Sequence, residues 1–195
     1  DVCSSDLGGE AAGMATYLKA LDPSIRIIAV EPDDAACLKA ALAADQPVRL
    51  EHVGIFVDGC AVRGIGALPF ELLRDRVDEV VTVDADQVCA AIRDVFEDTR
   101  SIVEPAGALA VAGMKQWCAK NPGNNRTVAA VLSGANMNFD RLGYVSERAG
   151  IGEQDEALFG VTIPERPGAY LDLIRSLGHR AITEFNYRYH GPGNA

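Results

Sequence analysis

Three short apolar runs, separated by helix-like segments, constrain the fold of this chain more than any other feature. The runs are RIIAV at 26–30, EVVTV at 79–83 and TVAAVL at 127–132. The last run is nearly all apolar, which is typical of a strand buried on both faces. Strands that alternate with helices predict an α/β fold with a doubly wound, mostly parallel sheet.

Helices are expected between these runs. Asp84 is followed three residues later by Gln87, which is the spacing of a capping box at a helix start. The residues after this cap place their apolar side chains on one face, as in a helix that packs onto a sheet. The segment 52–59 fits either a strand or an extended loop. The segments expected to be helical are 11–21, 32–44, 68–74, the helix capped by Asp84, 105–120 and the residues that follow Asn138.

The chain changes character after Arg148. Residues 149–156 are polar and contain glycine, so we expect a linker there. The next segments predict a strand at 158–163, a helix at 169–177 and a strand at 182–189. This β-α-β order matches about half of a ferredoxin-like α+β unit. We therefore expect one domain over 8–148 and a partial second domain over 157–195.

Composition excludes several classes of protein. The net charge of −10 argues against a nucleic-acid binder, because such proteins depend on clustered Lys and Arg. Small anions remain candidates, since backbone dipoles bind them without a basic surface. The five cysteines lack the spacing of a zinc site, and their number is odd, so reduced thiols are expected. No run approaches the roughly 20 apolar residues of a membrane helix, and no signal peptide is recognisable, so a cytoplasmic protein is predicted.

Candidate site residues lie where strands end and helices begin. Ser133 follows the run at 127–132, Glu104 precedes a helix that starts with proline, and Glu31 ends the first run. Ligands of doubly wound sheets bind beyond the carboxyl ends of the strands, which is where these side chains would lie. Each residue also fits a purely structural role as a cap or turn. Neither His52 nor His179 belongs to a triad-like motif, so hydrolase chemistry is not supported.

Four motifs, which occur in a fixed order along the chain, contain these candidate residues. GGEAAGMATYLKALDPSIRIIAVEP, FVDGCAV, VEPAGALAVAGM and VLSGANMNF resemble the carboxyl-terminal part of the biosynthetic threonine dehydratases. These are pyridoxal-phosphate enzymes of the tryptophan synthase β-like fold. The similarity continues through YVSERAGIGE, VTIPERPGAYL and ITEFNYR into the start of an ACT-like regulatory region. It begins at Gly8, and residues 1–7 are expected to be a non-native artefact joined to a truncated reading frame.

The resemblance implies a cofactor site for pyridoxal 5′-phosphate. Gly8 and Gly9 match the end of a glycine loop that holds the phosphate, and Ser133 matches a serine that bonds the pyridine nitrogen. Asp6 and Leu7 replace two glycines of that loop, and Glu10 replaces the leucine after it, which places two carboxylates beside the phosphate position. The residues implied to bind the cofactor are Gly8, Gly9, Glu10, Ala11, Gly59, Glu104 and Ser133.

The implied reaction is the conversion of L-threonine to 2-oxobutanoate and ammonia, a step toward isoleucine. In this family a lysine forms a Schiff base with the cofactor. The lysines of this chain have no matching context, so the chain alone is expected to be inactive; they are Lys19, Lys39, Lys115 and Lys120. The resemblance also implies isoleucine and valine as effectors and a homotetramer as the assembly.

No metal is expected. Glu31 and Ala35 fall at positions where related enzymes bind a divalent cation, but Cys37 replaces the aspartate of the third position. A hard cation that prefers oxygen would lose a ligand there.

One alternative stays open and one fails. A non-catalytic protein that senses amino acids or small anions can be built on the same α/β sheet. A coherent first strand would favour this alternative, and DVCSSDL does not supply one. A dinucleotide-binding protein is not supported, because no G-x-G-x-x-G follows a strand.

Overall fold

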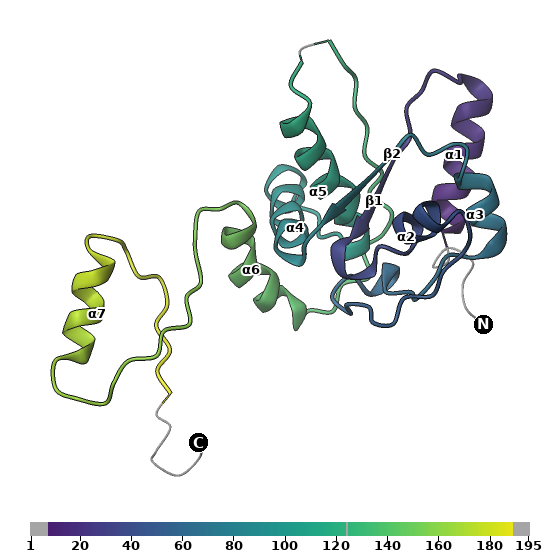
Figure 1. Cartoon of the computed structure of the whole chain (residues 1–195). Coiled ribbons are helices and arrows are strands. Elements are labelled where there is room, and N and C mark those ends of the chain that lie inside the picture. The colour runs from purple at the N-terminus through teal and green to yellow at the C-terminus, as the bar shows by residue number, and fades with distance from the viewer. Residues whose placement is uncertain (1–7, 124, 189–195) are drawn as a thin grey trace. The chain divides into compact units, whose positions relative to one another are not determined.

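A computed structural model of the chain describes residues 8–123 and 125–188. They divide between Ala157 and Leu158 into two compact units, each of which is described by itself. The expected artefact at 1–7 and the last residue of the expected strand 182–189 lie outside the described residues. Figure 1 shows the elements along the chain. Among the described residues, no helix has the length and apolar character needed to cross a membrane.

The first unit is built on two parallel strands, β1 (Ile28–Pro32) and β2 (Glu79–Val83). Ile28 lies opposite Glu79 and Pro32 opposite Val83. Because successive side chains of a strand point to opposite faces, the sheet contributes to two apolar clusters. Ile28, Val30, Val81 and Val83 belong to one cluster, whereas Ala29 and Val80 belong to the other. Helices cover both faces (Figure 1), as the α/β prediction requires.

Three helices form the larger cluster on one face: α4 (Ala85–Thr99), α5 (Pro105–Lys120) and α6 (Arg141–Gly152). The predicted capping box at the start of α4 is confirmed. The Asp84 carboxylate accepts a hydrogen bond of 2.8 Å from the Gln87 amide, and the Gln87 side chain accepts one of 3.0 Å from the Asp84 amide. These bonds satisfy backbone groups that a helix start leaves unpaired.

The other face is covered by α1 (Gly9–Leu21), α2 (Cys37–Ala44) and α3 (Ala67–Leu73). The single helix expected over 32–44 is instead a 3-10 turn, η1 (Asp33–Ala35), followed by α2. The break has a local cause. The Glu31 carboxylate accepts hydrogen bonds of 2.7 and 2.9 Å from the Leu38 and Lys39 amides, so the α-helix starts only where these amides are satisfied.

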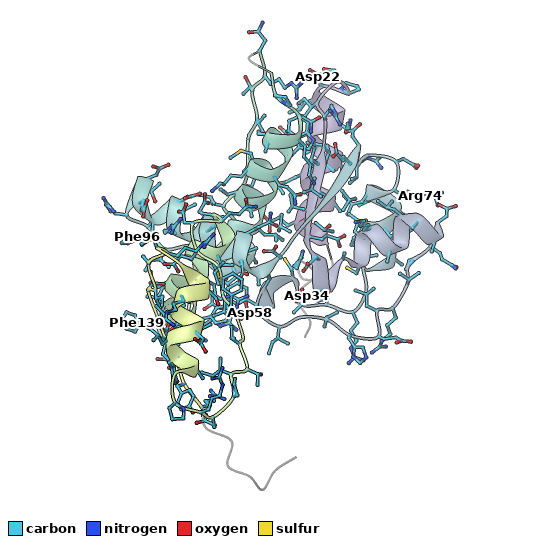
Figure 2. All side chains as sticks on the ribbon, turned by 60° about the vertical axis from the view of Figure 1, so that its left-hand side comes forward. Asp22, Asp34, Asp58, Arg74, Phe96 and Phe139 are labelled. Carbon is cyan, nitrogen blue, oxygen red and sulfur yellow. The ribbon has the colours of Figure 1, made fainter. Side chains whose placement is uncertain are left out.

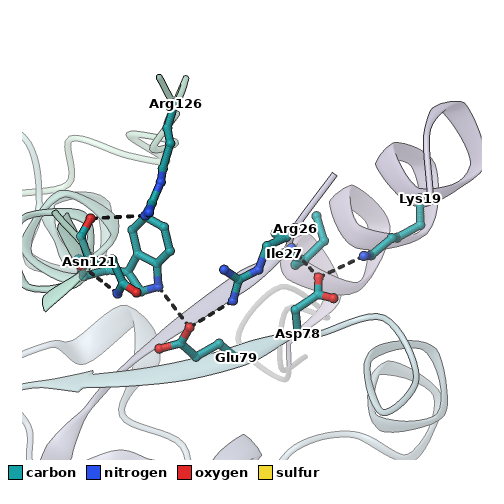
Figure 3. A network of polar contacts seen from close by, with 8 residues as sticks. Lys19, Arg26, Ile27, Asp78, Glu79, Asn121 and Arg126 are labelled. Atoms are coloured by element: carbon teal, nitrogen blue, oxygen red, sulfur yellow. Dashed lines mark hydrogen bonds and ion pairs between the residues drawn. The ribbon is translucent and has the colours of Figure 1, made fainter. Parts of the chain in front are cut away.

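Side chains fix the register at the amino ends of the two strands (Figure 3). The Asp78 carboxylate accepts a hydrogen bond of 2.9 Å from Lys19 Nζ and one of 2.7 Å from the Ile27 amide. The hydrogen bond from Lys19 is the main cause that lowers the pKa of Asp78. Next to it, Glu79 accepts a hydrogen bond of 2.9 Å from the indole N–H of Trp117 in α5. The polar groups therefore join α1, the strand pair and α5.

The strand expected at 127–132 is not present. These residues run as an extended segment without strand pairing, and Val131 and Leu132 are 48% and 45% exposed. The sequence has the apolar character of a strand, but a strand also needs a neighbour to receive its backbone hydrogen bonds. Similarly, 52–59 is a loop that ends in the 3-10 turn η2 (Asp58–Cys60).

The end of the first unit differs from the expected linker. Helix α6 continues through Gly152, although a linker was predicted from residue 149. The Arg148 guanidinium pairs with Asp86 of α4, and Lys115 of α5 pairs with Glu153. The Asp155 and Glu156 amides then donate to the Gly150 carbonyl, so the chain remains attached to α6. The polar sequence of 149–156 reflects these surface contacts.

The second unit contains the predicted helix, α7 (Ala169–Leu177). The segments 158–163 and 182–188 lie outside any strand, although strands were predicted there. Ring contacts of Tyr170 with Phe185 and Tyr187, at centroid distances of 5.6 and 5.3 Å, hold the later segment against α7. A two-stranded sheet is marginal in water, and here aromatic contact replaces strand pairing.

Candidate functional site

A cavity of about 830 Å³ opens in the first unit, between α1, β1, α5 and the extended segment 127–133. Its size lies in the range of sites for small molecules and cofactors. Most of the residues expected to bind a cofactor lie on its wall, although they come from three separate parts of the sequence. Those that line it are Gly8, Glu10, Ala11, Gly59 and Ser133, whereas Gly9 and Glu104 are not among the lining residues.

Gly8 forms the start of α1 on the cavity wall. Its φ is +93°, a left-handed conformation that favours glycine, and an added Cβ would lie 3.3 Å from the Ile65 side chain. The amides of the first helical turn have no partner within the helix, and the helix dipole adds partial positive charge there. This end of α1 can therefore bind an anion. The exposed carboxylate of Glu10 adds negative charge to the same turn and opposes such binding.

Gly59 lies on η2, close to the first turn of α5. A Cβ at Gly59 would come within 2.9 Å of the Ala106 Cβ, so the loop approaches the helix as closely as a glycine permits. Arg141 fixes this loop through an ion pair of 3.1 Å with Asp58 and a hydrogen bond of 3.2 Å to the Phe56 carbonyl. Asp22 precedes β1 and Asp34 follows it; Figure 2 shows Asp58 at the Asp34 end of the strand. The loop with Gly59 thus lies at the carboxyl end of the sheet.

Ser133 is exposed on the cavity wall, and Glu104 positions the turn that follows it. The Glu104 amide donates a hydrogen bond of 3.1 Å to the Gly134 carbonyl, and its carboxylate accepts one of 3.2 Å from the Asn136 amide. Glu104 is therefore a positioning residue for the Ser133 turn in this structure. Its predicted direct contact with a cofactor remains a prediction.

Two glycines that sequence reasoning missed bring α5 and this turn together. An added Cβ at Gly107 would lie 2.8 Å from the Gly134 carbonyl oxygen, and one at Gly134 would overlap the Glu104 carboxylate. Arg141 was missed for a similar reason, since its partners Phe56 and Asp58 lie far away in the sequence. No local pattern marks such contacts, because they depend on where distant segments meet.

Glu31 also lines the cavity, but its carboxylate is used by α2. It is 9% exposed and accepts the amides of Leu38 and Lys39. Burial raises the pKa of Glu31, while these two hydrogen bonds oppose the shift. Burial, followed by the nearby Glu31 carboxylate, raises the pKa of the Cys37 thiol to about 12. Cys37 is therefore a neutral thiol, which is a poor ligand for a hard cation.

Four lysines occur in the sequence, and none is among the residues that line the cavity. Lys19 pairs with Asp78, and Lys115 pairs with Asp94 and Glu153. Lys39 and Lys120 lie on α2 and at the end of α5. The cavity therefore combines an anion-binding helix start with a serine hydroxyl, but without an amine from the described residues.

Comparison with known proteins identifies the family. The family described as "Pyridoxal-phosphate dependent enzyme" matches residues 2–134, which is more than half of the chain. The chain belongs to the pyridoxal-phosphate dependent enzymes. Residues 147–195 match the family described as "C-terminal regulatory domain of Threonine dehydratase".

Curated relatives match this chain over most of its length. The biosynthetic L-threonine dehydratase IlvA of Salmonella typhimurium is 53% identical over 188 residues, which are 96% of this chain and 37% of that protein. The mitochondrial threonine dehydratase of Schizosaccharomyces pombe is 50% identical over 96% of this chain and 32% of its own length. The chain thus spans about a third of the length of these relatives.

Solved structures agree with the fold. The processed form of threonine deaminase isoform 2 from Solanum lycopersicum superposes with a TM-score of 0.72 at 40% identity. The superposition covers 73% of this chain and 42% of that one. The predicted fold class, an α/β tryptophan synthase β-like sheet followed by a regulatory unit, is therefore confirmed.

The residues on the cavity wall fit pyridoxal phosphate in two respects. The start of α1, with a glycine in the left-handed conformation, suits the phosphate, and the Ser133 hydroxyl suits a ring nitrogen. Both groups lie on one cavity at the carboxyl end of the sheet, where ligands of parallel sheets bind. Glu10 is the one lining carboxylate at the helix start, and it weakens the fit without blocking it.

Proposed function

We propose that the chain is part of a threonine ammonia-lyase that converts L-threonine to 2-oxobutanoate and ammonia with the help of pyridoxal phosphate. The observation that carries the proposal is the position of Gly8 and Ser133 on one cavity wall, from segments more than 120 residues apart. The names of the relatives, all threonine dehydratases, support the choice of threonine as substrate.

The proposed work of this chain is to hold and orient the cofactor. The amides at Gly8, Gly9, Glu10 and Ala11 would donate hydrogen bonds to the phosphate, and the left-handed conformation of Gly8 leaves the start of α1 without a side-chain cap. When bound, pyridoxal phosphate supplies an electron sink for the substrate carbanion. The Ser133 hydroxyl would form a hydrogen bond with the ring nitrogen and, because it is neutral, would not enforce the protonation of that nitrogen. Glu104 holds the Ser133 turn, and Gly59 leaves room beside the ring.

The remaining parts of the proposal concern the longer protein. The lysine that binds the cofactor has to come from outside the matched stretch, so we expect no turnover from the 195 residues alone. The match of residues 147–195 to a regulatory domain supports control by an amino acid, with isoleucine and valine as the proposed effectors. A homotetramer in the cytoplasm completes the proposal.

Binding of pyridoxamine 5′-phosphate tests the proposed site without requiring catalysis. This probe keeps the phosphate and ring nitrogen but cannot react with surface lysines. Trp117, the single tryptophan, lines the cavity, so its emission should be quenched as the site fills. Ser133→Ala should weaken binding about 3-fold to 10-fold, the value of one hydrogen bond.

Ser101→Ala provides the matched control, because Ser101 is an exposed serine away from the cavity. It should bind the probe like the unchanged chain. Equal affinities for the two variants, or quenching by inorganic phosphate alone to the same extent, would argue against the proposed site. Release of 2-oxobutanoate by the purified 195-residue chain would contradict the proposed need for an external lysine.

A further inference from the structure

Helix α6 lies across the border between the two family matches. The match to the pyridoxal-phosphate dependent enzymes ends at residue 134, and the match to the regulatory domain begins at residue 147. Because α6 runs from Arg141 to Gly152, its first half precedes the regulatory match and its second half lies within it. A helix is a stiff element, so a displacement of one half is passed on to the other half.

The first half of α6 holds the loop that carries Gly59. Arg141 forms an ion pair of 3.1 Å with Asp58 and donates a hydrogen bond of 3.2 Å to the Phe56 carbonyl. One turn later, the Tyr144 ring packs against the Phe56 ring at a centroid distance of 5.0 Å. Since Gly59 follows Asp58 directly and lines the cavity, its position on the wall depends on where α6 lies.

The second half of α6 is attached to α4. The Arg148 guanidinium donates hydrogen bonds of 2.5 and 2.9 Å to the two carboxylate oxygens of Asp86. The backbones also approach closely, because a Cβ added at Gly152 would overlap the Asp86 carbonyl. The attachment to α4 therefore fixes the half of α6 that belongs to the regulatory match.

The groups that make these two attachments touch one another. Arg141, Tyr144 and Arg148 follow at spacings of three and four residues, which places them on one face of α6. The Arg148 guanidinium lies over the Tyr144 ring, 5.8 Å from its centroid. Contacts on this face thus continue from Asp86 of α4 to the Phe56 ring of the loop. The three side chains are not among the residues that line the cavity, so they act on it through the loop.

We propose that this face of α6 couples the regulatory part of the chain to the cofactor site, with Arg141 as a positioning residue for the Gly59 loop. The coupling rests on the proposed function, because it concerns the same site. A displacement of the second half of α6 moves the loop and changes how tightly the wall holds the cofactor ring. An amino acid bound by the regulatory domain acts on the site to the extent that it favours one position of α6.

Hydrogen exchange of the 195-residue chain tests the coupling without a cofactor. The amides of Cys60 and Ala61 donate hydrogen bonds of 2.9 and 3.2 Å to carbonyls of the same loop, so their exchange reports how firmly the loop is held. Arg148→Gln removes the ion pair with α4 and should speed this exchange by about threefold or more. The Leu38 amide at the start of α2 should keep its original exchange rate, because the overall stability changes little.

Further variants give matched comparisons. Arg74→Gln also removes an arginine–aspartate ion pair, of 2.8 Å and at the end of α3, and should leave exchange at Cys60 unchanged. Asp86→Asn breaks the α4 pair from the other side and should act like Arg148→Gln. In the Arg141→Ala background, where the loop is already released, Arg148→Gln should add almost nothing.

Three results of the exchange experiment would overturn the coupling. They are unchanged exchange at the loop amides in Arg148→Gln, an equal acceleration at the Leu38 amide, and an effect of Arg148→Gln that is the same with and without Arg141.

Pyridoxamine 5′-phosphate tests the effect of the coupling on the site. Arg148→Gln should weaken binding of this probe by about threefold, although Arg148 lies outside the cavity lining. Arg141→Ala should weaken it by about tenfold, and Arg141→Lys, which keeps a positive charge for Asp58, should restore most of the affinity. Unchanged affinity in Arg141→Ala would overturn the positioning role. A failure of the unchanged chain to bind the probe would contradict the proposed function alone, since the exchange experiment involves no cofactor.

Discussion

Two apolar segments of similar length, 79–83 and 127–132, have different fates in the first unit. The first becomes β2, where Val81 and Val83 are 7% and 1% exposed. The second has comparable side chains but stays unpaired, with Val131 48% exposed. The difference lies in their neighbours, since β2 has β1 on its edge and α4 and α5 on its face. An apolar segment thus forms a β-strand only where a second segment lies beside it and pairs with its backbone.

Charged substitutions in the two segments should differ most in their effect on stability. Val83→Asp places an unpaired carboxylate in the core, and we expect a loss of about 3–5 kcal/mol in the free energy of unfolding. Val131→Asp, at an exposed position of the unpaired segment, should change it by less than about 0.5 kcal/mol. Urea unfolding followed by Trp117 emission measures both. Similar losses for the two variants would mean that 127–132 is buried as deeply as β2.

The turn that ends the unpaired segment should be the next most sensitive point. A Cβ at Gly134 would overlap the Glu104 carboxylate, so Gly134→Ala should cost about 1–3 kcal/mol and weaken pyridoxamine phosphate binding. Gly143 of α6 has nothing within 4 Å of an added Cβ, and Gly143→Ala should be neutral or stabilise by up to about 1 kcal/mol. Unfolding curves and probe titrations check both variants. A neutral Gly134→Ala would show that Glu104 does not hold the turn.

A smaller effect is expected where β2 passes into α4. Asp84→Ala removes the side-chain half of the capping box and should cost about 1 kcal/mol of unfolding free energy. Asp98→Ala, an exposed change near the end of the same helix, serves as the control and should not destabilise. Thermal unfolding of the two variants would reveal the difference. An equal response would indicate that α4 is fixed by packing alone.

Glu31, at the carboxyl end of β1, should make the free energy of unfolding weakly dependent on pH. Burial raises the pKa of Glu31, so the unfolded chain ionises before the folded one as pH increases. The contribution of protonated Glu31 to the free energy of unfolding is fully present below the ordinary pKa of a glutamate. It is lost as the pH rises through the raised pKa of Glu31 in the folded chain. The free energy of unfolding of the unchanged chain, relative to that of Glu31→Gln, should therefore fall as the pH rises between these two pKa values. Denaturant titrations at several pH values measure it, and the exposed Glu71→Gln should give a flat difference.

Local features of the fold could be predicted from the sequence, and contacts between distant segments could not. The helix over 105–120, the strand over 79–83 and the cap at Asp84 depend on neighbouring residues, and all three were confirmed. The break in 32–44 was missed because Glu31 reaches forward to amides seven and eight residues away. Strand 127–132 was overpredicted because its composition says nothing about a partner.

The candidate site shows the same division. Reasoning from the residues alone placed Ser133 and Glu31 at the ends of predicted strands, but it could not decide between a functional and a purely structural role for either. The resemblance to threonine dehydratases selected Gly8, Gly59 and Ser133, and the structure then placed all three on one cavity wall. The residues that hold this wall together, such as Arg141 and Gly134, were absent from both lines of reasoning because their partners are distant in the sequence.

The attachment of α6 limits how the second unit can act. The contacts of Arg148 and Glu153, together with the amides that return to Gly150, keep the chain on the first unit as far as Glu156. The twelve residues 157–168 then lead to α7, and a fully extended chain of that length reaches about 40 Å. Because this tether is covalent, the effective concentration of α7 around α6 does not change when the protein is diluted.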